Sequence, residues 1–477
     1  MSDDRMRIAY VHDSPLHESL ATDYRNPEQL SSLGFTDVVI SDQMSGCLFS
    51  ITPELTDQID SAIDAGLGVW LMDDLFTLPT DSDAGCPGLQ ESWDLTAQAI
   101  RDTIESAPQI RGLVFRYGET FDSPDSTLKR VDLLRCECIH CSSMDGLTRR
   151  RKVIEMLESV VCREMGKRCI LRLWDLTEDG VHANRMLQTK VLTKWAGDPR
   201  FFVSVKHTLT DYWRHQPWNP TIPVEGPPRL IEFQCEREYE FIGLVPNWQG
   251  PEWSQGPIEC GERGWTGLAN VRPQDWAGSW IIPLGGGWSS RHASSELWAD
   301  MNLHAALSLT TNPGRDAGEI LAEWLSMNGF PPESQSLFEK SGDLILRLRY
   351  FDVWRLIANQ HWMPSENWFR DDNFVPGACA KIANTVVENG MADLLRSERA
   401  LATAMARSHL MEAEALPECK HTQFLIASYR WALNFAEWTE ETWTQLLQAT
   451  PLNRAECKSL LLSRLKEDPM APLSVMD

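Results

Sequence analysis

Short apolar segments alternate with segments of helical periodicity over the first 300 residues of this 477-residue chain. The segments are apolar throughout instead of alternating with polar residues, which is typical of parallel strands buried on both faces. Eight such strand–helix repeats predict a closed (β/α)8 TIM barrel, with an open doubly wound sheet as the alternative. The predicted strands are Arg7–Asp13, Thr36–Ser41, Gly68–Asp74, Arg111–Glu119, Lys167–Asp175, Phe201–Thr208, Arg229–Cys235 and Thr266–Val271.

The segments between these strands carry helix start and stop signals. Residues 53–66 begin with an acidic turn and end on Gly66, and residues 149–166 are amphipathic and end on Gly166. A G-x-G-x-x-G pattern does not follow the first strand, so the sequence gives no support to dinucleotide binding.

The pattern changes near Asn312. Residues 316–329, 333–360 and 418–448 are helical in periodicity, and no strand pattern interrupts them. An α/β barrel of about 250 residues or more leaves room for one further domain in a chain of this length. We therefore expect a catalytic barrel over residues 1–312 and an all-helical C-terminal domain over residues 313–477.

The charge and hydropathy of the chain restrict the kinds of molecule that it is expected to bind and the compartment in which it is expected to work. The net charge of −24 argues against binding to nucleic acid or to an anionic membrane surface. The chain has no apolar run of transmembrane length, and its charged N-terminus lacks the apolar core of a signal peptide. Most of the twelve cysteines are scattered singly in apolar segments, as reduced cysteines are. We expect a cytoplasmic protein.

Polar residues close several of the predicted strands. Barrel enzymes carry their active sites at the C-terminal ends of the strands, so these side chains are candidates for chemistry. They are Asp74, Arg116, Glu119, Arg172, Lys206, His207 and, just beyond its strand, Asp211. Two carboxylates on opposite sides of a glycosidic bond are what sugar hydrolysis requires. Each residue also has a structural alternative: a salt-bridge partner, a loop cap or, for His207, a buried hydrogen-bonding histidine.

Ten of the 20 tryptophans lie between Trp195 and Trp298, a region of polar loops rich in Gly and Pro. Such loops are not expected to bury all of these rings. Exposed rings, Trp213 and Trp248 among them, would serve as platforms for sugar rings, and packing between loops and barrel is the alternative.

The segment VSVKHTLTDYWRHQPWNPTI, followed by LIEFQCEREYEFIGLVPNW, resembles the catalytic barrel of the family 67 α-glucuronidases. TGLANV and residues 302–324 are similar to that family's last strand and to the entry of its helical C-terminal domain. The resemblance implies a general acid at Glu119 and base-side carboxylates at Asp211 and Glu238. It also implies that Arg116, Arg172 and Lys206 hold the carboxylate of a uronic acid, a task that suits guanidinium groups.

The resemblance therefore implies an inverting, exo-acting α-glucuronidase that removes a uronosyl residue from an oligosaccharide and forms a homodimer through its helical domain. It is strongest over residues 201–324. The motif around Glu119 is altered, and the family's N-terminal β domain is not matched. A neutral or sulfated sugar and a non-catalytic carbohydrate-binding barrel therefore stay open. For a metal-dependent lyase or isomerase, the strand ends do not offer the necessary His and carboxylate ligands.

A compact cysteine cluster, Cys136, Cys138 and Cys141, follows the fourth predicted strand, with His140 inside it. Three thiolates in C-x-C-x-x-C spacing are half or more of a structural zinc site, and a loop of reduced cysteines is the alternative. The proposed chemistry itself requires no cofactor.

Overall fold

The structure is a computed structural model. It describes residues 5–11, 23–40, 51–81, 86–118, 127–130, 136–175, 180–237, 239–260, 267–284, 293–357, 368–370, 373–467 and 474–475.

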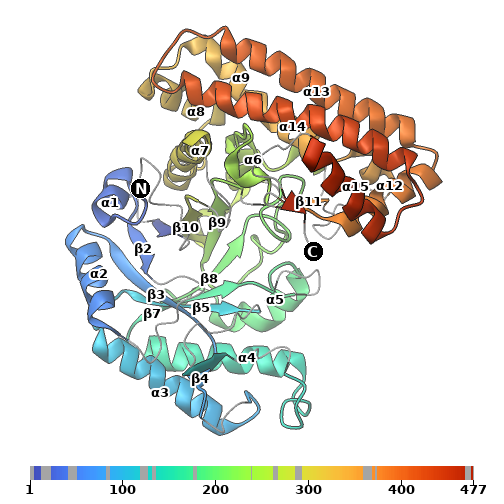
Figure 1. Ribbon diagram of the computed structural model, residues 1–477. Helices are drawn as coiled ribbons and strands as arrows, with labels where there is room; N and C mark the ends of the chain where they lie inside the picture. Colours follow the sequence, from blue (N-terminus) through green and yellow to red (C-terminus); the bar gives the residue numbers. More distant parts are fainter. Residues whose placement is uncertain are drawn as a thin grey trace.

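Eight parallel strands form a closed barrel in the order β1-β10-β9-β8-β7-β5-β3-β2 (Figure 1). Each pairs with its neighbours in parallel register, and β10 closes the ring against β1. The strands are β1 (Met6–Tyr10), β2 (Asp37–Ile40), β3 (Gly68–Asp74), β5 (Gly112–Tyr117), β7 (Arg168–Leu173), β8 (Phe201–Lys206), β9 (Arg229–Gln234) and β10 (Trp276–Ile282). The predicted (β/α)8 barrel is therefore confirmed.

The predicted eighth strand, Thr266–Val271, is wrong. Its described part holds a short 3-10 turn, Leu268–Asn270, preceded by Gly267 in a positive-φ conformation of 71°. The eighth strand is instead β10, further along the chain, where WAGSWII supplies an apolar run long enough to pair with both β9 and β1.

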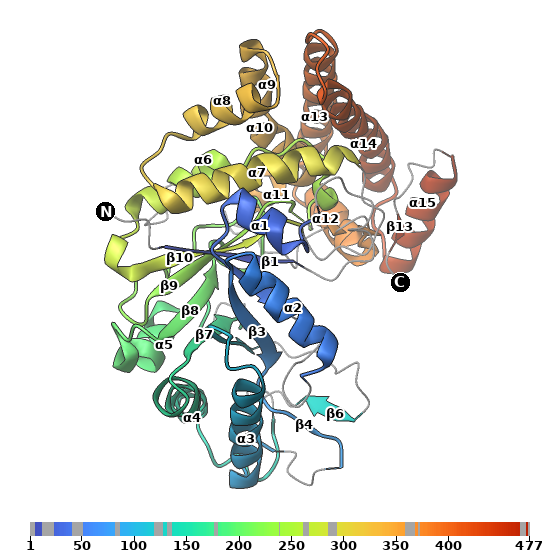
Figure 2. The ribbon, with the colours of Figure 1, turned by 90° about the vertical axis from the view of Figure 1, so that its left-hand side faces the viewer.

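Helices cover the outside of the barrel, as Figures 1 and 2 show. The predicted helix over residues 53–66 is α2, which begins after the N-cap Thr52 with a proline in its first turn. The helix predicted over 149–166 is α4, capped by Asp145, and a π-helical turn over Glu158–Glu164 extends it. The helices up to residue 311 are α1 (Pro27–Leu33), α2 (Pro53–Asp64), α3 (Gln90–Ser106), α4 (Gly146–Leu157), α5 (Arg185–Leu192), α6 (Gly250–Gln255) and α7 (Ala293–Thr311).

Side chains of the barrel strands alternate between two cores. In β7, Cys169, Leu171 and Leu173 pack outward against the helices, whereas Ile170 belongs to a separate apolar core shared by all eight strands. That core fills the barrel interior. Because strand side chains alternate with a period of two, Arg172 points to the same side as Ile170.

The C-terminal region is built mainly of helices. The long helices α13 and α14 pack against each other, and α7 lies between the barrel and this region, in contact with β10, α8 and α14 (Figure 2). The helices are α8 (Ala317–Met327), α9 (Gln335–Glu339), α10 (Ser341–Arg349), α11 (Asp352–Ile357), α12 (Pro376–Glu388), α13 (Ala392–Glu414), α14 (Thr422–Gln448) and α15 (Arg454–Glu467).

The expectation of a wholly helical C-terminal domain needs one correction. Three two-residue strands, β11 (Phe369–Arg370), β12 (Asn373–Phe374) and β13 (Ser474–Val475), form a small sheet there. Strands this short carry no recognisable period in sequence. The boundary predicted between residues 312 and 313 falls in the loop between α7 and α8, and the division into two domains stays a prediction.

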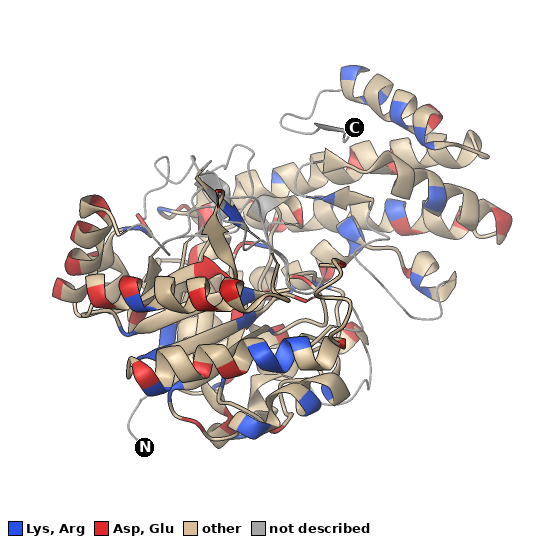
Figure 3. Cartoon of the chain, turned by 90° about the horizontal axis from the view of Figure 1, so that it is seen from below, with Lys and Arg blue, Asp and Glu red and all other residues tan. Residues whose placement is uncertain are grey.

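Basic and acidic residues are interspersed along the helices in the view of Figure 3. Among the described residues, no helix combines the length and hydropathy needed to cross a membrane.

Candidate active site at the barrel rim

Inward-facing residues at the C-terminal ends of the strands form a cluster of ion pairs. The register sets Asp74 beside Arg116, Arg116 beside Arg172, and Arg172 beside Ser204, one layer above the apolar interior. Arg116 Nε lies 2.7 Å from Asp74 Oδ1, and each of these two side chains is 1% exposed. We call the six charged residues of this layer and its edge the rim cluster: Asp74, Arg116, Arg172, Lys206, Asp211 and Glu232.

Arg172 and Glu232 form the second pair, inside the barrel mouth and without solvent exposure. Arg172 donates from Nε and Nη2 to the carboxylate at 3.0 and 2.9 Å. Ser204 and Tyr212 donate their hydroxyls to the same carboxylate at 2.6 and 2.7 Å. Burial alone would raise the pKa of Glu232, but Arg172 and these hydrogen bonds outweigh it and lower the pKa to about 2. Glu232 is therefore an ionised structural carboxylate.

Lys206 and Asp211 form the third pair, with Lys206 Nζ 2.5 Å from Asp211 Oδ1. The Asp211 side chain is 20% exposed, far more than the other members of the rim cluster. Burial pushes the pKa of Asp211 upward, but the charge of Lys206 and its hydrogen bond outweigh this and hold the pKa below its ordinary value. Asp211 is thus an ionised carboxylate that solvent reaches.

The indole of Trp174, the residue after β7, brings the three cations of the rim cluster together. Arg172 Cζ lies 4.3 Å from a ring centroid of Trp174, Lys206 Nζ lies 5.2 Å away and Arg116 Cζ 5.4 Å. The three cations therefore lie around one indole ring. Each one, however, also has a carboxylate partner, so the rim cluster carries three positive and three negative charges.

A second set of ion pairs fixes the loops that follow β8 and β9. Arg237, in a positive-φ conformation, pairs with Glu240 at 3.2 Å and with Glu252 of α6. Arg214 pairs with the same Glu252 at 3.5 Å and with Glu259. The loop that bears Asp211 is thereby tied to the neighbouring loop and to α6.

Of the three predicted catalytic carboxylates, Asp211 lies in the rim cluster, whereas Glu119 and Glu238 lie outside the described residues. Tyr239 is described: its hydroxyl hydrogen-bonds to Asp211, and its ring stacks on Trp213 with centroids 5.3 Å apart. Tyr239 therefore lies close to Asp211. The catalytic roles of the three carboxylates stay predictions.

His207, a predicted sugar contact, lies on the outer side of β8. Its Nδ1 is 3.0 Å from the carbonyl of Glu232, its Nε2 is 3.5 Å from Glu252, and its ring packs among Trp218, Phe233 and Trp253. The side chain is 2% exposed. This environment is that of a buried structural histidine, one of the two alternatives that the sequence leaves open.

The predicted sugar platforms Trp213 and Trp248 are 2% and 3% exposed. The other described tryptophans between Trp195 and Trp298 are also buried. The expectation of exposed rings is therefore wrong for the described tryptophans. For Trp213 and Trp248, contacts with the helical region contribute to this burial: Arg349 of α10 lies over the ring of Trp213, and Ser341 of the same helix accepts the backbone N–H of Trp248.

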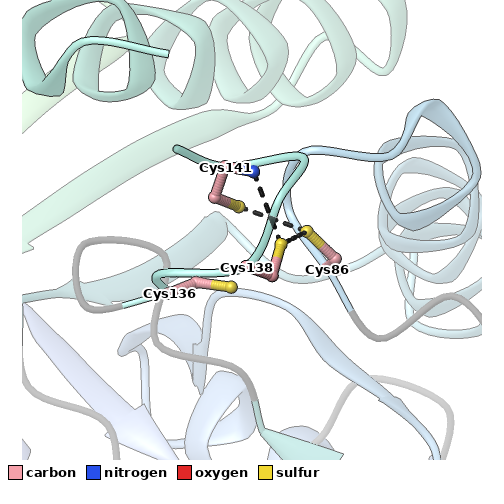
Figure 4. Close-up of side chains that lie close together, drawn as sticks. All are labelled: Cys86, Cys136, Cys138 and Cys141. Carbon is pink, nitrogen blue, oxygen red and sulfur yellow. Dashed lines mark hydrogen bonds between the residues drawn. The ribbon is translucent and has the colours of Figure 1, made fainter. Parts of the chain in front are cut away.

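The predicted cysteines Cys136, Cys138 and Cys141 lie together and are joined by Cys86 from the loop before α3 (Figure 4). The four sulfur atoms lie within 4.8 Å of one another. His140 is exposed and is not among the clustered groups.

Several residues of these sites were not identified from the sequence. Trp174 and Tyr212 carry no motif, although each follows or precedes a predicted site residue by two positions or fewer. Ser204 was hidden inside an apolar strand. Cys86 stands in Cys-Pro-Gly, a turn sequence that could have indicated a fourth metal ligand.

No protein-family model matches the sequence, and the comparison with curated proteins gives no match. Among solved structures, a mutant of the Thermobaculum terrenum O-GlcNAc hydrolase is similar at 10% identity and a TM-score of 0.45, over 97% of this chain and 89% of that one. A protein named CpGH84B is similar at 9% identity and a TM-score of 0.44, over 97% of this chain and 73% of its own. Neither of these two proteins is named as a family 67 enzyme. Likenesses this distant carry no argument about function, and the barrel is established by its own strand pairing.

Proposed function

We propose that the chain is a glycoside hydrolase that cleaves a neutral sugar from an oligosaccharide at the rim cluster. The proposal rests mainly on the state of Asp211. Its carboxylate is partly exposed to solvent, is kept ionised by Lys206, and lies at the C-terminal end of the barrel strands, where barrel enzymes have their active sites. An ionised carboxylate of this kind can accept a proton from an attacking water or stabilise an oxocarbenium-like transition state.

The charge balance of the rim cluster favours a neutral sugar. Arg116, Arg172 and Lys206 each have a carboxylate partner within 3 Å. A uronate carboxylate would have to displace one of these partners from a mostly buried site, and an unpaired buried carboxylate is costly. A sugar that brings only hydroxyl or amide groups leaves all three pairs in place.

In this proposal Asp211 and Glu238 work on the base side of the reaction, and Glu119 is the general acid. Trp174 and Lys206 line the sugar-binding position around Asp211. Inversion of configuration follows from the same assignment if the acid and base carboxylates stand about 6.5–9.5 Å apart, which leaves room for the attacking water. The cytoplasmic location and the homodimer stay predictions.

A uronosidase is the second candidate, because the three cations do converge around one indole ring. It requires that at least one ion pair of the rim cluster opens when the substrate binds. The two candidates predict different substrates and are therefore separable.

The test is a panel of chromogenic neutral hexosides, N-acetylhexosaminides and uronosides, assayed with the wild type, Asp211→Asn and the surface control Asp102→Asn. We expect release from a neutral glycoside, a loss of about 100-fold or more in Asp211→Asn, and an unchanged control. If the chromogenic group is released only from uronosides, the second candidate, a uronosidase, would replace the proposed neutral-sugar hydrolase. Hydrolysis that survives Asp211→Asn would refute the role of Asp211, and no hydrolysis of any glycoside would favour a binding barrel.

A further inference from the structure

We propose that Cys86, Cys136, Cys138 and Cys141 form a structural zinc site that joins two loops of the barrel rim. The site shares no residue with the rim cluster, and the proposal is independent of the proposed hydrolase function. We refer to the four residues as the sulfur cluster.

The geometry of the sulfur cluster suits a tetrahedral ion. Zinc–sulfur bonds of about 2.3 Å place the sulfur atoms of a tetrahedral site about 3.8 Å apart. Cys86 Sγ lies 2.8 Å from Cys138 Sγ and 3.2 Å from Cys141 Sγ, and all four sulfur atoms lie within 4.8 Å of one another. The two shortest distances lie below about 3.8 Å and the limit for the whole set lies above it, so the sulfur atoms are close enough to share one ion. Figure 4 shows the four side chains directed toward one small space.

Backbone N–H groups already point at two of the sulfur atoms. Gly88 N donates to Cys86 Sγ at 3.2 Å, and Cys141 N donates to Cys138 Sγ at 3.4 Å. Hydrogen bonds of this kind disperse the negative charge of metal-bound thiolates and fix their orientation. Arg149 adds a positive charge beside the cluster, because its guanidinium bonds the carbonyls of Cys136 and Cys141.

Both ligand loops are anchored to helices. Ser92 of α3 donates to the carbonyl of Cys86 at 2.6 Å, and Trp93 of α3 donates to the carbonyl of Pro87 at 2.7 Å. On the other side, Asp145 caps α4 four residues after Cys141. The ligands are therefore held before an ion binds, which reduces the entropy cost of assembling the site.

The two loops approach each other so closely that only glycine fits at position 88. A Cβ on Gly88 would lie 2.7 Å from His140 Cβ and 2.8 Å from the carbonyl carbon of His140. This close packing keeps the thiols of both loops near enough to bind the same metal ion. Four thiolates fill the coordination of zinc, so the site is closed and structural.

The position of the sulfur cluster suggests its structural role, which is to join two segments that follow neighbouring barrel strands. Strand β4 (Thr77–Pro79) from the segment after β3 pairs with β6 (Leu128–Arg130) from the segment after β5, outside the barrel. The sulfur cluster joins the same two segments further along the chain, through Cys86 and Cys136–Cys141. The ion would hold together the two segments that follow β3 and β5 in the chain.

The first experiment measures metal in the full-length protein purified without added metal or chelator. Elemental analysis is expected to give about one zinc per chain, and X-ray absorption is expected to give four sulfur neighbours at about 2.3 Å. Absence of stoichiometric metal, iron in place of zinc, or nitrogen and oxygen neighbours would overturn the proposal. Two missing free thiols in a denatured, metal-free sample would indicate a disulfide instead.

Cysteine variants test whether zinc is bound by these four residues. Cys86→Ser and Cys138→Ser are expected to reduce bound zinc at least tenfold, whereas the buried control Cys169→Ala keeps it. Hydrogen exchange of peptides that contain Cys86 or Cys136–Cys141 should rise in the two ligand variants and after chelation of the wild type. Full zinc in Cys86→Ser would refute the four-cysteine site, and wild-type metal content decides the matter even where a variant fails to fold.

Discussion

Lys206 Nζ lies 2.5 Å from Asp211 Oδ1, and this pair joins the last residue of β8 to the most exposed carboxylate of the rim cluster. Because Lys206 lowers the pKa of Asp211, its replacement by an uncharged side chain of similar length raises that pKa. The acidic limb of any activity that depends on ionised Asp211 should then shift upward.

For Lys206→Met we expect the acidic limb of the kcat/KM profile to move up by about one pH unit or more. The exposed Lys194→Met, which removes a surface ion pair with Glu155, should leave the profile unchanged. An unshifted limb in Lys206→Met would mean that Asp211 does not set the pH dependence.

The buried pair of Arg172 and Glu232 predicts a strongly non-additive response to mutation. Glu232→Leu leaves the Arg172 guanidinium buried without its carboxylate, which should destabilise the fold by about 3–5 kcal/mol. The double variant Arg172→Met with Glu232→Leu should recover much of that loss, because neither charge is then buried alone. Urea unfolding midpoints of the two single variants and the double variant test this, and additive effects would contradict it.

The depressed pKa values of Glu232 and Glu252 predict acid destabilisation. Both pKa values fall from an ordinary 4.5 to about 2 in the folded protein. Burial raises these pKa values, but the charge of Arg172 beside Glu232, and the charges of Arg237 and Arg214 beside Glu252, lower them by more. Since the folded pKa lies below the unfolded one, this stabilisation is fully present above pH 4.5 and is lost as the pH falls toward 2.

Each of these two carboxylates should contribute about 3 kcal/mol at neutral pH. Urea unfolding measured from pH 7 to pH 3 should show a steep fall in the midpoint below pH 4.5. Glu232→Gln should show a shallower fall over that range. A midpoint that does not change down to pH 3 would show that the two carboxylates are not held ionised as described.

Closure of the barrel depends on Gly278, at the β1–β10 seam. Its φ is 146°, and a Cβ there would lie 2.0 Å from the carbonyl oxygen of Met6. Gly278→Ala should therefore destabilise the protein by more than about 2 kcal/mol or prevent folding. The control is Gly377→Ala in α12, where a Cβ would have Arg454 Cδ as its nearest neighbour, at 4.0 Å. A thermal midpoint in Gly278→Ala equal to that of the control would contradict the packing at the seam.

Seven of the eight barrel strands could be predicted from sequence because each is a continuous apolar run between helical segments. The eighth was misplaced because TGLANV and WAGSWII are both short and apolar, and the difference between them is pairing with β1, whose residues lie 272 positions before their partners in β10. Periodicity records local burial and does not record which distant strand completes a ring.

The candidate site likewise has features that the sequence predicts and features that only the tertiary structure reveals. Strand ends and their polar residues are local features, so Asp74, Arg116, Arg172, Lys206 and Asp211 could be chosen from the sequence. Their pairing could not, because a cation in a sequence does not reveal whether a carboxylate from another strand neutralises it. The charge balance that favours a neutral sugar over a uronate is therefore a property of the tertiary structure.

The sequence by itself determined the barrel architecture, the helices over residues 53–66 and 149–166, and the three clustered cysteines, because each depends on residues close together in the chain. Only the tertiary structure decided which strand closes the barrel, which tryptophans are buried, which carboxylate faces each cation, and that Cys86 joins three cysteines 50 residues or more downstream. These features depend on contacts between distant segments, and packing of the whole chain alone fixes such contacts.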